Sequence, residues 1–143
     1  MQRGFTLIET LVYLAIFSMV IGGIVSATYL LLQSSGKVQT NAMLLQEEQF
    51  LMATFERLVG QSTSATVSSG VLTLSGPNTI GLSGTNLELN SVALNNTNVR
   101  VTRAAFSVSG SPIGVTADIT VEANAPNGQI VTYSASTTKY LRQ

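Results

Sequence analysis

The chain has 143 residues, seven basic and seven acidic side chains, and a formal net charge of zero. This balance gives no basic patch of the kind that binds nucleic acid, and Arg100 and Arg103 are too few to make one. Neither cysteine nor histidine occurs, which excludes disulfides and thiol chemistry and removes the commonest general base and metal ligand. The length leaves room for one modest globular domain.

The first predicted element is an apolar helix over residues 5–33. No charged residue occurs between Thr10 and Gly36, a stretch about 40 Å long as a helix. The hydrocarbon core of a bilayer is about 30 Å thick, and the apolar side chains lie all round the helix rather than on one face. We therefore predict a transmembrane segment. Arg3 before it indicates a cytoplasmic amino terminus, with the later residues outside.

Glu9 is the exception in this apolar segment. An acid deep in lipid costs about 2.5–3.5 kcal/mol, so its carboxylate requires a partner. Two local roles are open: Thr6-x-x-Glu9 fits a capping box, and an acid near a helix start interacts favourably with the helix dipole. Neither local role excludes a partner from another chain.

The stretch Arg3-Gly4-Phe5-Thr6-Leu7-Ile8-Glu9 resembles the processing site of type IV pilins and type II secretion pseudopilins. Leader length, basic residue, Gly-Phe junction, acid position and apolar length all agree with that pattern, which covers the first part of the chain only. The resemblance implies that residues 1–4 are a leader, cut after Gly4 by prepilin peptidase, and that the new amino terminus on Phe5 is methylated. It also implies that Glu9 meets the terminal amine of a neighbouring subunit in a filament.

The same resemblance implies the partners and the location. The partners are other pilin or pseudopilin subunits, prepilin peptidase, an inner-membrane assembly platform and membrane lipid. The location is the bacterial cytoplasmic membrane, crossed once, and then a filament. Two alternatives exist for the segment. A secretory signal peptide has an apolar region of only about 7–15 residues and a small-residue cleavage site, and this run is longer without a clear site. An uncleaved anchor helix is the stronger alternative.

Residues 34–60 are predicted to continue the helix as an amphipathic half, because no proline occurs there. Apolar side chains recur at three- and four-residue steps along one face. This stripe consists of Val38, Ala42, Leu45, Gln49, Met52, Phe55 and Val59, widened by Leu44, Leu51 and Leu58. We expect it to pack on the protein's own sheet rather than to hold a cofactor. Ser34 to Gly36 is a candidate kink, and Gly60 is a candidate terminator for a helix that ends at about Val59.

Residues 61–143 are predicted to form a β-sheet domain of short runs with period-two alternation, separated by Gly, Pro and Asn turn signals. Residues 61–66 are predicted to be a polar connection and residues 95–98 a turn. The predicted strands are 71–74, 79–82, 86–89, 99–102, 104–108, 115–122 and 130–136. The clearest hairpin joins the last two, and its Asn127-Gly128 pair suits positive φ angles.

This order predicts an α+β fold, in which a long N-terminal helix, half membrane-spanning and half amphipathic, packs on a C-terminal antiparallel sheet. The resemblance implies the same pilin-like architecture. We find no catalytic constellation and expect no cofactor, no metal site and no enzymatic activity. Asp118 and Glu122 share one face of a strand, where a weak cation site is the alternative to a solvated surface. Asn95-Asn96-Thr97 fits the N-glycosylation pattern and is assigned no role.

The function that the resemblance implies is that of a minor pilin or pseudopilin, a structural subunit of a type IV pilus, a type II secretion pseudopilus or a competence pseudopilus. The stretch ending Phe55-Glu56-Arg57-Leu58, followed by a Ser/Thr-rich sheet domain, is more similar to a minor than to a major subunit. Two other classes stay open. One is a membrane-anchored extracytoplasmic binding module outside any filament. The other is an anchored enzyme, which the lack of His, Cys and clustered acids disfavours.

Overall fold

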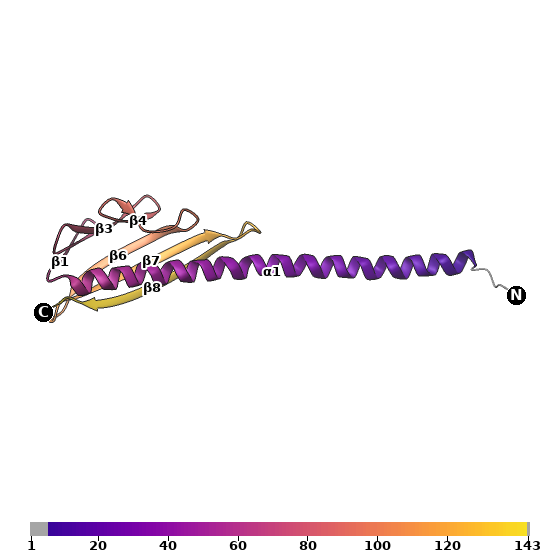
Figure 1. The fold of residues 1–143 in the computed structure, drawn as a ribbon, viewed down its shortest axis with the longest axis horizontal. Coiled ribbons are helices and arrows are strands. Elements are labelled where there is room, and N and C mark those ends of the chain that lie inside the picture. The colour runs from indigo at the N-terminus through magenta and orange to yellow at the C-terminus, as the bar shows by residue number, and fades with distance from the viewer. Residues whose placement is uncertain (1–5, 143) are drawn as a thin grey trace.

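The computed structural model describes residues 6–142, as one long helix followed by strands in two sheets. The elements are α1 (Leu7–Gln61), β1 (Ala65–Ser68), β2 (Val71–Leu74), β3 (Asn78–Ser83), β4 (Asn86–Leu89), β5 (Val92–Ala93), β6 (Arg100–Ser109), β7 (Gly114–Asn124) and β8 (Ile130–Tyr140). Figure 1 shows the strands beside the C-terminal half of α1, while the N-terminal half extends alone. The predicted α+β fold is confirmed.

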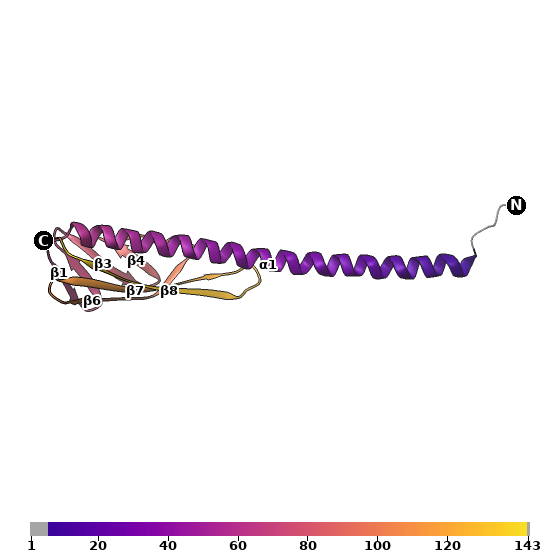
Figure 2. The same ribbon diagram turned by 90° about the horizontal axis from the view of Figure 1, so that it is seen from below.

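The helix α1 runs without interruption for 55 residues, which corresponds to about 80 Å. Proline is absent from it, so the ladder of backbone hydrogen bonds is not broken. Residues 34–36 are helical, and Figures 1 and 2 show no sharp bend there, so the candidate kink is wrong. The Thr40 hydroxyl donates to the carbonyl oxygen of Gly36 at 3.0 Å, which adds a bond within the helix at this point.

The helix ends slightly later than the sequence indicated. Gly60 lies inside the last turn, and Gln61 is the final helical residue. The next residue, Ser62, closes the helix twice. Its backbone N–H donates to the carbonyl oxygen of Val59 at 3.0 Å, and its buried hydroxyl donates to that of Leu58 at 2.7 Å. A serine cap therefore ends the helix, where a glycine had been expected to do so.

The strands form two antiparallel sheets, where the sequence prediction had one. The strands β1 to β5 follow one another as a meander, and β7 lies between β6 and β8 in the second sheet. The two short strands predicted around residues 99–108 are one strand, β6, whose register against β7 shifts between Val101 and Arg103. The sequence analysis missed β1 and β5 because their side chains are mostly exposed and carry no clear alternation.

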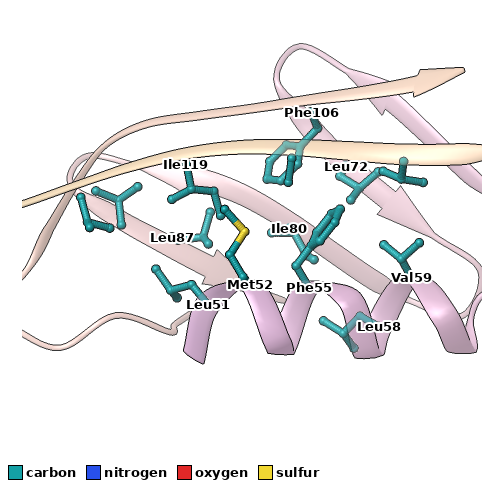
Figure 3. Packing of buried hydrophobic residues seen from close by; sticks show 14 of the residues in the cluster. Leu51, Met52, Phe55, Leu58, Val59, Leu72, Ile80, Leu87, Phe106 and Ile119 are labelled. Carbon is teal, nitrogen blue, oxygen red and sulfur yellow. The ribbon is translucent and has the colours of Figure 1, made fainter. Parts of the chain in front are cut away.

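The C-terminal half of α1 buries one face against both sheets. Figure 3 shows Leu51, Met52 and Phe55 of α1 pointing toward side chains of β2, β3, β4, β6 and β7. The ring of Phe55 stacks on that of Phe106 with 6.2 Å between the centroids. Burial of apolar area on this scale is the main favourable contribution to folding, at about 1.5–3 kcal/mol for each large side chain. One contiguous core therefore joins the helix and both sheets.

The predicted stripe on α1 is correct at its C-terminal end and wrong at its N-terminal end. Six of its members are buried: Leu44, Leu51, Met52, Phe55, Leu58 and Val59. Val38, Ala42 and Gln49 are exposed. The buried face is centred on the row of Leu44, Leu51 and Leu58. Val38 is exposed because it precedes Thr40, the first side chain of the helix that is buried.

The hairpin between β7 and β8 is confirmed, with Asn124 paired to Ile130 at its base. Within the Asn127-Gly128 pair, only Gly128 has a positive φ, of 78°. Asn127 stabilises the turn differently, because its Oδ1 accepts the backbone N–H of Gln129 at 3.1 Å. Pairs of this kind are frequent in turns, where an Asn side chain imitates a backbone carbonyl.

The loop before β6 is organised by Asn95, which is buried. Its Oδ1 accepts the backbone N–H of Leu87 at 2.8 Å, and its Nδ2 donates to the carbonyl oxygen of Val99 at 2.7 Å. Next to it, Glu47 of α1 accepts the backbone N–H of Asn96 at 2.7 Å. The asparagine of the N-glycosylation pattern is thus a buried structural residue.

Candidate processing and assembly site

Glu9 lies in the first turn of α1. Thr6 is the N-cap residue, with extended backbone angles, and its carbonyl oxygen accepts the N–H groups of Glu9 at 3.0 Å and Thr10 at 3.3 Å. The Thr6 side chain makes no cap hydrogen bond. A capping box requires that bond, so the capping-box interpretation of Thr6-x-x-Glu9 is wrong.

The Glu9 side chain is exposed. Within residues 6–142, no hydrogen bond or ion pair involves its carboxylate. The helix start places partial positive charge from unpaired N–H groups near this acid, which is the second of the two local roles. That interaction is weak for an exposed group and still leaves the carboxylate oxygens open to a stronger partner.

The surface around Glu9 is apolar and bare. In the most apolar 18-residue window of α1 the mean hydropathy is 2.1, and none of that window is buried within the protein. A shallow hollow runs along this surface between Tyr13, Phe17 and Val20. By length and composition the segment could cross a membrane. Figure 2 shows no strand beside this half of the helix.

The sequence analysis did not single out Tyr13, the polar side chain one helical turn after Glu9. The spacing of four residues places both side chains on the same face of α1, and Tyr13 is about half exposed. The four-residue spacing from Glu9 was the sequence signal that could have pointed to Tyr13 as a second polar side chain on this face of the helix. Gly4 and Phe5, the predicted cleavage and methylation positions, lie outside the described residues.

The possible cation site on β7 gains no support. Asp118 is exposed and lies opposite Ala105 and Ser136 in the sheet register, and Glu122 lies opposite Arg100. In the part of the chain that the structure describes, no three His, Cys, Asp or Glu side chains lie close enough to share a metal ion. A solvated strand face is the simpler description of these two acids.

The comparison with known families bears on the first part of the chain. Residues 1–25 match the family model of the prokaryotic N-terminal methylation motif. The match includes Gly4, Phe5 and Glu9, and it extends into the apolar half of α1. No curated protein and no solved structure matches the chain.

The chain therefore carries the type IV pilin and pseudopilin signal at the start of a long helix packed on antiparallel strands. The motif supports processing of the chain as a pilin-type substrate of prepilin peptidase, and it implies assembly with other pilin subunits. The apolar N-terminal half of α1 fits a membrane anchor.

Proposed function

We propose that the protein is a minor pilin or pseudopilin, a structural subunit of a short envelope filament of the type IV pilus, type II secretion or competence kind. One observation carries the proposal. A single uninterrupted helix connects the methylation motif to the domain, with its N-terminal half bare and apolar and its C-terminal half buried in the core. A helix of this kind can move from lipid into a bundle of like helices without refolding of its domain.

The proposed mechanism is structural. The subunit is stored in the cytoplasmic membrane through residues 5–33, with its strands outside, and an assembly platform moves it into the filament. Apolar helix surface then exchanges lipid for neighbouring helices, and packing rather than the hydrophobic effect supplies the driving force between them. The polar groups in such a core decide the register.

Glu9 is the proposed register residue. After cleavage behind Gly4, the amine on Phe5 of one subunit would pair with Glu9 of its neighbour. The exposed carboxylate, bound to no group within residues 6–142, supports this role. A charge left unpaired in an apolar core costs several kcal/mol, so only the staggered arrangement that pairs every Glu9 is favourable.

The minor role and the absence of enzymatic activity are part of the proposal. The small domain is rich in Ser and Thr, and its acids are scattered over helix and strands. The chain has no His or Cys to act as a general base or nucleophile. The protein is thus proposed to be the substrate of a peptidase and a building block, without chemistry of its own.

Mass spectrometry of the amino terminus, on protein isolated from its native host, tests the proposal. The expected result is a chain that begins at methylated Phe5. A chain that still begins at Met1, in cells with an active prepilin peptidase, would refute the proposal. It would leave an anchored extracytoplasmic module outside any filament as the better description.

A further inference from the structure

The tip of the β7–β8 hairpin lies against α1 where the apolar run ends. Figure 1 shows this tip as the part of the strand domain that reaches furthest toward the N-terminal end of the helix. The contact is close, because a Cβ on Gly36 would lie only 3.0 Å from Cγ of Pro126. A groove of about 300 Å³ between the two elements is lined by Tyr29, Leu32, Gln33, Pro126 and Asn127.

The length of the apolar run indicates the depth at which this contact would lie in a bilayer. Residues 7–32 form a helix about 39 Å long, whereas the hydrocarbon core is about 30 Å thick. With Glu9 near the cytoplasmic side, the last apolar turns, from Tyr29 to Gln33, extend into the outer headgroup layer. Tyrosine is enriched at that level in membrane proteins. The hairpin tip lies beside these turns and therefore at the same level.

The composition of the tip suits a headgroup layer. Residues 126–130 are exposed and uncharged, and Ile130 leaves 62% of its surface accessible. The exposed basic side chains of Lys37 and Arg100 are close to the tip. Lys37 follows Gly36, and Arg100 lines a surface hollow together with Pro126. The acid facing Arg100 in the sheet register is Glu122, and the next acid along α1 is Glu47, about 15 Å beyond Lys37.

We propose that the hairpin tip, residues 126–130, is a second membrane contact, which rests in the outer headgroup layer before the subunit enters a filament. The partner is the lipid surface itself. This inference rests on the proposed membrane-anchored state of the subunit. Its consequence is mechanical: an anchor longer than the hydrocarbon core can tilt, and a second contact beside it limits the tilt and fixes which side of α1 faces the membrane.

The chain contains no tryptophan, so single substitutions give clean fluorescence probes in the full chain. Three variants are reconstituted into phosphatidylcholine–phosphatidylglycerol vesicles whose lipids carry bromine near the headgroup or deep in the acyl chain. Ile130→Trp reports on the hairpin tip, and Val20→Trp reports on the middle of the apolar half. Val67→Trp in β1 is the matched control, because β1 lies at the opposite end of the domain (Figure 1).

For Ile130→Trp, we expect a blue shift of emission on reconstitution and a loss of intensity that is larger with shallow than with deep bromine. Val20→Trp should lose most intensity with deep bromine, and Val67→Trp should lose none. If Ile130→Trp behaves like Val67→Trp while Val20→Trp is quenched, the second contact is refuted and the anchor stands. If Val20→Trp is also unquenched, the membrane anchor of the proposed function fails, and the second contact fails with it.

A second measurement controls for any change that the Ile130→Trp substitution itself makes in the hairpin. The chain has no cysteine, so Gln129→Cys accepts one spin label at the tip, where the backbone N–H of Gln129 keeps its bond to Asn127. Collision with oxygen, which concentrates in lipid, should exceed that of Val67→Cys, and collision with a water-soluble nickel complex should be lower. Equal accessibility of the two positions would overturn the proposal independently of tryptophan.

Discussion

The two halves of α1 share one backbone geometry and differ in what covers them. Leu14 in the N-terminal half leaves 62% of its surface accessible, whereas Leu51 in the C-terminal half leaves 1%. The first half has apolar side chains on every side, and the second has one apolar face with Glu47, Glu48 and Glu56 beside it. The folded chain therefore covers only the apolar face of the C-terminal half. The N-terminal half stays uncovered within the described residues, and an exposed apolar surface of this extent is typical of a site for lipid or for another protein.

Glycines show the same difference on a smaller scale. A Cβ on Gly22 or Gly23 would meet nothing within 4 Å, whereas one on Gly36 would meet Pro126 and one on Gly60 would meet Lys139. In the C-terminal half, the protein itself fills the space beside the glycines. In the N-terminal half that space stays open, so any close packing there involves a partner outside the chain.

The largest expected effect belongs to Glu9→Ala. The substitution would leave the amine of a neighbouring subunit unpaired in an apolar core, at a cost of about 3–5 kcal/mol. We expect loss of filament incorporation with unchanged stability of the strand domain, measured by shearing filaments from cells and immunoblotting. Glu48→Ala, on the same helix but in its C-terminal half, is the control. Incorporation of Glu9→Ala at the level of the control would contradict the register role, as expected of a simple anchor.

The second-largest expected effect comes from comparing the two halves of α1 directly, with one leucine substituted in each. Leu51→Ala removes a fully buried side chain and should lower the free energy of unfolding by about 2–5 kcal/mol. Leu14→Ala removes the same atoms from the bare surface and should leave that free energy unchanged. Urea unfolding of the detergent-solubilised chain, followed by tyrosine fluorescence, measures both. Similar losses in the two variants would show that the N-terminal half contributes to the fold of the domain.

A smaller effect is expected in the loop before β6, which contacts α1 through the bond from the Asn96 N–H to Glu47. Asn95→Ala leaves the buried N–H of Leu87 and carbonyl of Val99 without their partner and should cost about 1–3 kcal/mol. Asn98→Ala, an exposed neighbour, is the matched control. Hydrogen exchange should show faster exchange of the Leu87 amide in Asn95→Ala alone. Unchanged protection would mean that water replaces the Asn95 side chain at no cost.

The smallest effect concerns a single contact between α1 and β8. The Thr137 hydroxyl donates to the Glu56 carboxylate at 2.7 Å, and Thr137→Val should lower the free energy of unfolding by about 0.5–1.5 kcal/mol. Thr132→Val on the exposed face of β8 should have no such effect. A double-mutant cycle with Glu56→Ala, which removes the acceptor oxygen, isolates the pair, and a coupling energy of zero would mean that the bond does not contribute to docking of β8 on the helix.

Local pattern was sufficient for much of the fold. The strands β2 and β4 were predicted to the residue, because Val71–Leu74 and Asn86–Leu89 alternate and are bounded by turn residues. The β7–β8 hairpin was predicted for the same reason. In the candidate site, Glu9 was found because a single acid in a long apolar run is conspicuous. Where the pattern is weak, as in β1 and β5, the prediction failed.

The sequence by itself determined the apolar half of α1, the continuation of the helix beyond it, and the strand signals that follow. Each of these depends on neighbours a few residues apart. Only the tertiary structure decided that the strands divide into two sheets and that Val38 is exposed while Leu44 is buried. It also decided that Asn95 is an internal residue and that the β7–β8 tip lies beside Gly36. These features depend on contacts between distant segments, whose energies are set by packing against surfaces that no local pattern contains.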